Sequence, residues 1–302
     1  MKQLGFLLIL LSVINFSCNR PVKRSLPFGS VKGIHFTEVR RVFNTGLVFD
    51  KVGYQLEPLW QIHFLSDDSV MAYSPKMKRY YGFHVYFDHD SIFNMLDAWL
   101  KLKKISKDSL VLQSLRVQDK VILDDDEGSQ VFMTFYSDWY IKNKGAEKIR
   151  QLGIPGKQDT LFIKDRVKIA NSNIDSAFSA RIPVVLKSKN PLVKVEKVKN
   201  VSTPLNKIDA SVDYLYPEYN IAIHKAYEDF NYSFSVFVDD KGLMHFGKSD
   251  IPYSHEYKAT YEKIMKGIID GYLQHYLEIT PGNTLGIPHN SSIYLNVEGK
   301  RD

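Results

Sequence analysis

The side chains that could do chemistry are few and lie far apart along the 302-residue sequence. Cys18 is the only cysteine, so neither an internal disulfide nor a zinc site built on a cysteine pair is available. None of the nine histidines belongs to a His-x-x-x-His or His-Glu-x-x-His pair. The sequence also has no Gly-x-Ser-x-Gly motif and no glycine-rich phosphate loop. These observations favour a non-catalytic protein without a cofactor.

Two short acidic segments are the candidate metal-binding residues. Asp88-His89-Asp90 joins two carboxylates and an imidazole, and residues Asp124 to Glu127 supply four consecutive carboxylates. The second segment lacks the ligand spacing of a calcium-binding loop, and both segments are more typical of solvated turns. We therefore predict no metal site. Carboxylates that only the fold brings together leave one alternative open, a hydrolase without short sequence motifs.

An apolar leader precedes Cys18. Residues Leu4 to Ile14 carry no charge, and Ser17 is the small residue directly before the cysteine. A membrane-spanning helix needs about 20 apolar residues, so this stretch is too short to cross a bilayer. A charged start, a short apolar core and a small residue before the cut are the pattern of a secretory signal peptide. We predict that residues 1–17 are a signal peptide.

The place of Cys18 resembles that of the acylated cysteine in bacterial lipoproteins. In that family the thiol receives a diacylglyceryl group, the peptide is cut before the cysteine, and the new amine is usually acylated too. Two or more acyl chains anchor firmly where one gives marginal binding. The resemblance implies lipidation of Cys18 and a protein of the bacterial cell envelope, held on a membrane and facing the periplasm. The alternative is an ordinary secretory signal followed by a spare thiol.

The composition narrows the class of partner. With 44% hydrophobic and 13% aromatic residues, the chain has enough apolar side chains to build folded cores. Its formal net charge of +6 is spread along the chain, without a recognised nucleic-acid-binding module. We predict no nucleic-acid partner and favour a solvated basic surface over one that meets anionic lipids or cell-wall polymers. The pattern carries no indication of an oligomeric state.

Short β-strands dominate the first predicted domain, residues 41–142. A tether is expected before it, at residues 18–40, where prolines, glycines and basic residues interrupt any regular period. Alternating apolar residues indicate strands that bury one face. These strands are expected at Trp60–Phe64, Phe83–Phe87, Ser109–Leu112 and Val131–Tyr136.

The order of these strands resembles the small lipocalin-like domains of exported bacterial proteins. The resemblance rests on the strand that begins at Trp60, the Asp67-Asp68-Ser69 turn, and the run Trp99–Leu102 that leads into Ile105–Leu112. It implies an antiparallel meander or barrel that could hold an apolar ligand between its walls. In residues 143–207 the pattern is weaker, and we predict a connecting region with local strands at Leu161–Ile163 and Ile182–Leu186.

The C-terminal residues carry a strand, strand, helix, strand order. Tyr232–Val238 and Leu243–Phe246 are expected to form a hairpin, with Gly242 available for positive φ. Ser254 is placed to begin a helix, and Ser292–Val297 supplies the last strand. The helix has one apolar stripe: Tyr257, Tyr261, Ile264, Ile268 and Tyr272. These tyrosines also suit a carbohydrate-stacking platform, but their helical spacing favours core packing.

This order resembles the C-terminal domain of TonB-like proteins. The resemblance spans residues 208–299 and rests on short motifs in the family's order: Tyr216-Pro217, Val238-Asp239-Asp240-Lys241-Gly242, Ile279-Thr280-Pro281 and Gly286-Ile287-Pro288. It implies a small sheet whose open edge can accept an extended peptide as an added strand. The chain has no long proline-rich spacer, so a role in passing inner-membrane energy to a receptor is not expected.

Taken as a whole, the sequence predicts an α+β protein, with an N-terminal antiparallel β meander or barrel-like domain before a small β-β-α-β domain. The predicted function is a lipid-anchored, non-catalytic interaction or scaffold module of the envelope, and its partner is a peptide segment or a cell-wall component. A binder of a small apolar ligand, using the N-terminal β domain, is the first alternative. The motif-poor hydrolase is the second.

Overall fold

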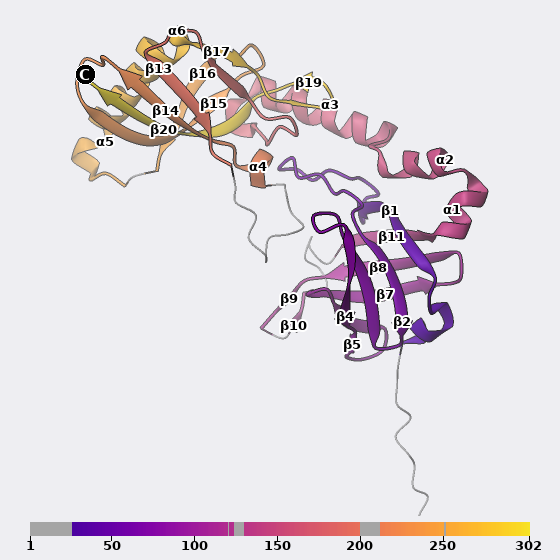
Figure 1. Ribbon diagram of the computed structural model, residues 1–302. Helices are drawn as coiled ribbons and strands as arrows, with labels where there is room; N and C mark the ends of the chain where they lie inside the picture. The colour runs from indigo at the N-terminus through magenta and orange to yellow at the C-terminus, as the bar shows by residue number, and fades with distance from the viewer. Residues whose placement is uncertain (1–25, 120, 124–129, 200–211, 251) are drawn as a thin grey trace, which may run out of the picture.

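The computed structural model describes residues 26–119, 121–123, 130–199, 212–250 and 252–302. It combines a large antiparallel sheet, a smaller mixed sheet and several helices, which confirms the α+β class. Figure 1 shows the two sheets in separate parts of the molecule, with helices α1 to α3 running from one toward the other. The predicted signal peptide, Cys18 and Asp124 to Glu127 lie outside the described residues. None of the described helices is both long and apolar enough to cross a membrane.

The N-terminal part is a nine-stranded antiparallel sheet that curls until it is nearly a barrel. Its strand order is β4-β3-β2-β1-β11-β8-β7-β6-β5, so the two edge strands follow each other in the chain, and only Val85 separates them. The strands are β1 (His35–Phe43), β2 (Gln61–Ser66), β3 (Ser69–Ser74), β4 (Arg79–His84), β5 (Tyr86–Phe87), β6 (Ile92–Met95), β7 (Ala98–Ile105), β8 (Ser109–Leu115) and β11 (Val131–Ser137). A short pair, β9 (Val117–Gln118) and β10 (Val121–Ile122), follows β8.

Alternate residues of these strands point inward, and their side chains fill the space that the curled sheet encloses. Phe36, Ile62 and Ala72 are cross-strand neighbours, and their side chains share the inner face. The 3-10 helix η1 (Pro27–Val31) adds Phe28, whose ring stacks on that of Phe64 with centroids 4.0 Å apart. Because the core is filled this way, it resembles the packed interior of a small barrel.

The predicted tether of residues 18–40 is wrong from Leu26 onward. Leu26, Phe28 and Val31 belong to the N-terminal core, and β1 begins at His35. The proline and glycines that suggested a linker instead shape a tight turn. Pro27 opens η1, and Gly33 takes a left-handed φ of 74° two residues before the strand.

Helices α1 (Asp138–Lys144), α2 (Ala146–Arg150) and α3 (Lys157–Ser172), with the 3-10 turns η3 (Gln151–Gly153) and η4 (Ile174–Ser176), connect the two sheets. The strand predicted at Leu161–Ile163 is wrong, because these residues lie within α3. Ile163, Val167 and Ala170 are buried at helical spacing, while Leu161 is exposed. The apolar run Leu161–Ile163, which resembles a strand in the sequence, thus belongs to an amphipathic helix.

The buried carboxylate of Asp159 fixes the start of α3. It accepts hydrogen bonds from Gly156 N at 2.7 Å and from Val48 N at 2.8 Å. The first satisfies a backbone donor at the helix N-terminus, and the second ties in the loop that follows β1. Val48 and Phe49 of that loop pack on α3 in a hydrophobic cluster of their own.

The C-terminal part is a five-stranded sheet in the order β13-β14-β20-β15-β16, in which only β14 and β20 run parallel. Its strands are β13 (Val193–Lys197), β14 (Glu218–His224), β15 (Phe230–Val238), β16 (Met244–Ser249) and β20 (Ser291–Lys300). Shorter pieces are α4 (Val212–Leu215), β12 (Val185–Ser188) paired with β17 (Leu277–Thr280), and β18 (Asn283–Thr284) paired with β19 (Ile287–Pro288). The predicted strand-strand-helix-strand order is therefore present among more elements.

One face of this sheet is covered by a helix that changes pitch. α5 (His255–Ile268) continues as a π-helical turn, η5 (Ile269–Leu273), and then as α6 (Gln274–Tyr276). The side chains packed deepest against the sheet are Met265, Ile268, Ile269 and Leu273. The predicted tyrosine stripe overlaps this one only in part. Tyr257 is 58% exposed, which places the start of the stripe outside the core.

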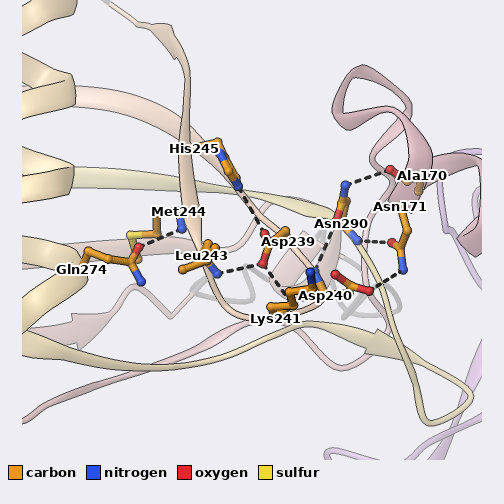
Figure 2. A network of polar contacts seen from close by, with 10 residues as sticks. All are labelled: Ala170, Asn171, Asp239, Asp240, Lys241, Leu243, Met244, His245, Gln274 and Asn290. Atoms are coloured by element: carbon orange, nitrogen blue, oxygen red, sulfur yellow. Dashed lines mark hydrogen bonds and ion pairs between the residues drawn. The ribbon is translucent and has the colours of Figure 1, made fainter.

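Figure 2 shows the polar network that closes the β15–β16 hairpin and joins it to α3. The carboxylate of Asp239 accepts from Lys241 N at 2.9 Å and Leu243 N at 2.8 Å, which holds the turn that the sequence predicted. Gly242 has φ 85°, and a Cβ there would lie 2.7 Å from the carbonyl oxygen of Ile279. Only glycine therefore suits this position.

Asn290 joins the C-terminal sheet to the end of α3. Its amide Nδ2 donates to Ala170 O at 2.8 Å, and its backbone N donates to Asn171 Oδ1 at 3.0 Å. Its Oδ1 accepts from Asp240 N at 3.2 Å. One side chain thus holds the hairpin and the helix together.

Candidate functional site

A pocket opens at the mouth of the N-terminal sheet, with a volume of about 450 Å³. Its floor is the inner face of β2, β3 and β4, where Ala72 and Tyr81 face the same side as the core residue Ile62. Its outer wall comes from later in the chain, from Arg181 and from Tyr214 of α4. Ligand sites often form in the mouths of β-barrels and between parts of a chain, and this pocket has both properties.

Aromatic rings supply most of the pocket wall. The aromatic residues that line it are Tyr54, Trp60, Tyr73, Tyr81, Phe83 and Tyr214, and of these Tyr73 turns its ring toward Tyr80 on the outer face. Leu59 and Leu96 add apolar surface. Rings of this kind present flat apolar faces to a ligand.

A buried ion pair stands on one side of the pocket. Glu38 is only 5% exposed, because a β-bulge between Glu38 and Arg40 interrupts the pairing of β1 with β11. Its carboxylate accepts both Nε and Nη2 of Arg41, each at 2.7 Å. It also accepts Leu59 N at 2.8 Å and Trp60 N at 3.0 Å. Four donors therefore satisfy this buried charge.

Arg41 is held flat beside a ring by this pairing. Its guanidinium carbon lies 5.8 Å from the ring centroid of Trp60, and its side chain lines the pocket. The sequence pattern of β1 gave no sign of this arrangement. The one sequence feature that could have indicated it is the i, i+3 spacing of Glu38 and Arg41, together with the tryptophan at the start of the next predicted strand.

Arg181 is held in the same manner on the opposite side. Its Nε donates to Gln55 Oε1 at 3.0 Å, its Nη2 donates to Glu57 Oε1 at 2.7 Å, and its guanidinium carbon lies 4.6 Å from the ring centroid of Tyr214. The Tyr214 hydroxyl in turn accepts Gln55 N at 2.9 Å. The segment around Gln55 is thereby fixed between the two halves of the chain.

The pocket therefore offers flat apolar walls and two arginines already oriented by carboxylates. In the described part of the chain, the hydrogen bonds found for each guanidinium use Nε and Nη2 and leave Nη1 for other acceptors. The lining holds two guanidinium groups and one carboxylate, that of Glu57, and the buried Glu38 behind Arg41 supplies a second negative charge that does not face the pocket. Such a lining suits a mostly apolar molecule with an oxygen acceptor at one end.

The residues singled out in the sequence do not meet at this pocket. Cys18 and Asp124 to Glu127 lie outside the described residues. In the Asp88-His89-Asp90 turn, His89 Nδ1 lies 2.6 Å from Asp88 Oδ2, and both side chains are about half exposed. Across the described residues, no group of three or more His, Cys, Asp or Glu side chains is arranged to hold a metal ion.

The C-terminal tyrosines form a row of ring contacts instead of a buried stripe. Tyr253 stacks on Tyr261 with centroids 4.1 Å apart, and Tyr261, Tyr232 and Phe230 follow at 6.2 and 5.9 Å. Burial raises the pKa of the Tyr232 phenol, aided by the neighbouring Tyr253, Tyr261 and Glu228. The row packs at the border of the C-terminal core.

No protein family matches the sequence, and no curated protein matches it either.

Proposed function

We propose that this protein binds a small molecule in the pocket at the mouth of its N-terminal sheet, as a non-catalytic, lipid-anchored protein of the bacterial cell envelope. The single observation that carries the proposal is the convergence of aromatic residues and two oriented arginines on one cavity of about 450 Å³. The leader and Cys18 support the envelope location.

The lining indicates the class of ligand. Flat aromatic walls favour a molecule with a planar or extended apolar body, which they cover on several sides. The free edges of Arg41 and Arg181 favour a carbonyl, carboxylate or sulfonate oxygen at its polar end. The buried part of the sheet below the pocket is filled with side chains such as Phe64 and Phe93, so a long acyl chain has no room to thread deeper.

A fluorescent probe tests the proposal directly. Anilinonaphthalene sulfonate has a flat apolar body and a sulfonate, and its emission rises in an apolar site. We expect saturable binding at one site, with quenching of the Trp60 emission. The substitution Ala72→Phe, which places a ring in the pocket floor, should weaken binding by about tenfold or more, corresponding to at least 1.4 kcal/mol.

The matched control adds the same ring elsewhere on the sheet. Lys104 lies in β7 with an exposed side chain, so Lys104→Phe should leave probe binding unchanged. Equal binding by the Ala72→Phe variant and the unaltered protein would refute the pocket as the site. Native mass spectrometry of protein purified from envelopes should then show which molecule occupies it in cells.

A second function, strand addition to the C-terminal sheet, is favoured by the edge strand β16. Within the described residues, β16 pairs only with β15, and its other edge has no strand beside it. An exposed edge offers backbone groups to an extended peptide. Lys241, His245, Lys248 and Lys266 lie on or beside this edge, which favours an acidic peptide or an anionic cell-wall component as the partner.

Charge reversal tests this second function. Lys248→Glu should weaken crosslinking of an acidic envelope partner to β16, because like charges repel an acidic segment. Lys194→Glu, on the opposite edge strand β13, serves as the control and should have no effect. Equal loss in both variants would indicate general surface charge and not strand addition at β16.

A further inference from the structure

Two histidines face each other on the outer surface of the N-terminal sheet, away from the pocket. His35 of β1 and His63 of β2 are directly paired residues, and their ring centroids lie 4.2 Å apart at an interplanar angle of 31°. Phe36 and Ile62 beside them point into the core, so the two imidazoles point outward. Tyr80 of β4 packs edge-on against both rings, with centroids 5.7 and 5.1 Å away.

One imidazole nitrogen in this cluster has no hydrogen-bond partner. Nδ1 of His63 is buried, and none of the described residues bonds to it. Buried polar atoms are nearly always satisfied in folded proteins, so this atom requires an explanation. Burial lowers the pKa of His63, and the neighbouring His35 lowers it further. Both effects keep the lone pair of a neutral imidazole free near neutral pH.

We propose that His35 and His63 form a binding site for a divalent late transition-metal ion, Cu²⁺ in preference to Zn²⁺. Neutral imidazole nitrogens are common ligands of both ions, and Cu²⁺ binds nitrogen ligands more tightly in the general order of affinities. Metal–nitrogen bonds of about 2.0–2.1 Å place two ligating nitrogens about 3.3 Å apart in tetrahedral geometry. The imidazole centroids lie 4.2 Å apart at an interplanar angle of 31°, so the rings must rotate for both lone pairs to converge on one ion.

The surroundings suit an open, partly hydrated metal site. His35 also lines a surface hollow of about 500 Å³, together with Asp108, Asp138 and Trp139. Burial raises the pKa of the Tyr80 phenol, and the negative charge of Asp138 raises it further. Lys107 is the one cation that lines the hollow. Two imidazoles would therefore supply the protein ligands, and water would complete the coordination, since no third acidic or histidine ligand joins them among the described residues.

Packing alone is the competing explanation. Two neutral imidazoles and a tyrosine can stack simply as an aromatic cluster. That explanation leaves Nδ1 of His63 without a partner, whereas a bound ion can reorient the ring and use its nitrogen. The two explanations differ in the Cu²⁺ affinity that they predict. Only a metal site at this pair requires that Cu²⁺ affinity falls when the exposed ring of His35 is removed.

The test is a titration of the full chain with Cu²⁺, followed by the emission of Trp139 and by electron paramagnetic resonance. We expect saturable quenching, because Trp139 lines the same hollow as His35, and hyperfine structure from two nitrogens. Loss of even an indirect partner commonly costs about 10–100-fold in metal affinity. His35→Gln should therefore weaken Cu²⁺ binding at least tenfold.

His84→Gln is the matched control. His84 is an exposed histidine of β4 on the same sheet, and its ring meets Tyr86 and not a second imidazole. This variant should keep the affinity of the unaltered protein for the proposed site. Bound ion should raise the melting temperature of the unaltered protein but not of His35→Gln, which monitors folding at the same time. Equal Cu²⁺ affinity in the unaltered protein and His35→Gln would overturn the proposal.

Discussion

At the scale of single residues, His289 shows how burial decides a protonation state. Its ring is fully buried and stacks on Phe178 with centroids 3.8 Å apart. Nδ1 lies 3.1 Å from the carbonyl oxygen of Asn290 and Nε2 lies 3.0 Å from Thr284 Oγ1. A carbonyl can only accept, so Nδ1 carries the proton and Nε2 accepts from the threonine hydroxyl. Burial, reinforced by the charge of Arg166, lowers the pKa of His289 to about 4.

This shift predicts a loss of stability in mild acid. The folded-state pKa lies below the ordinary value of 6.5, so protonation favours the unfolded chain. The contribution of His289 is complete above pH 6.5 and is lost as the pH falls toward 4. We expect it to remove about 2–3 kcal/mol from the free energy of unfolding between pH 7.5 and 4.5, as measured by urea denaturation. The loss should be smaller in His289→Asn and unchanged in His275→Gln, an exposed histidine. Equal pH dependence in all three proteins would contradict the assignment.

Glu38 allows a direct comparison of a buried and an exposed ion pair. Replacing it with alanine leaves Arg41 without its partner and leaves the backbone donors of Leu59 and Trp60 unsatisfied. Breaking a buried pair from one side costs about 3–5 kcal/mol. We therefore expect Glu38→Ala to lower the free energy of unfolding by that amount in urea denaturation.

Glu147 provides the control for this prediction. It pairs with Arg150 at the same i, i+3 spacing, but both side chains are mostly exposed. An exposed pair contributes about 0–1 kcal/mol, so Glu147→Ala should have little effect on stability. Similar losses for the two variants would mean that the Glu38 network is not what stabilises this corner of the sheet. Sequence alone gave no way to rank these two pairs, because they differ only in burial.

At the scale of elements, the strands were predicted better than the helices. The stretches Trp60–Phe64, Ser109–Leu112 and Val131–Tyr136 lie in or overlap β2, β8 and β11, because alternation directly reports a half-buried strand. Phe83–Phe87 is divided at Val85, whose buried side chain marks the turn from one edge of the sheet to the other. α3 was missed because its apolar side chains are few and some of them, such as Leu161, face solvent.

The helix after Ser254 was predicted correctly in place, and the predicted face was correct except at Tyr257 and in missing Met265, Ile269 and Leu273. A stripe with α-helical spacing assumes 3.6 residues per turn throughout, and the π-helical turn at Ile269–Leu273 changes that spacing. The buried side chains consequently follow Met265, Ile269 and Leu273, each four residues from the next. No local pattern in the sequence indicates such a turn, since it depends on the sheet beneath.

Substitutions on this helix test which face is buried. Met265 is fully buried against the C-terminal sheet, so Met265→Ala should leave a cavity and lower the free energy of unfolding by about 2–5 kcal/mol. Tyr257, which the sequence pattern placed in the stripe, is largely exposed. Tyr257→Ala should therefore change stability by no more than about 0.5 kcal/mol in the same thermal or urea unfolding measurement. The reverse ranking would support the stripe predicted from the sequence.

At the scale of the whole molecule, the pocket depends on chain segments that no sequence pattern connects. Arg41 and Trp60 belong to the N-terminal sheet, whereas Arg181 and Tyr214 come from beyond α3. The sequence predicted a ligand-holding sheet only through a family resemblance, and it indicated none of the residues that line the site. α3 and the Asn290 network bring the later segments back, so long-range packing and not local spacing creates the pocket.

The short sequence distance between Cys18 and the first described residue constrains how the molecule can meet a membrane. Leu26 already belongs to the N-terminal core, so only seven residues lie between it and the cysteine. A chain advances at most about 3.3–3.6 Å per residue, so an anchor at Cys18 would hold the sheet within about 30 Å of the bilayer. The ligand pocket would then lie near the membrane surface, where apolar molecules concentrate.

Removal of the anchor tests this arrangement. In bacteria grown with labelled fatty acid, the unaltered protein should carry label and sediment with membranes, whereas Cys18→Ala should carry none and become soluble after export. Ser17→Ala keeps a small residue before the cut and should behave as the unaltered protein does. Since the residues that line the pocket are Arg41 and later ones, the released variant should still bind the fluorescent probe with unchanged affinity. Label retained by the Cys18→Ala variant would place the lipid on another residue and remove the reason for holding the sheet near the membrane.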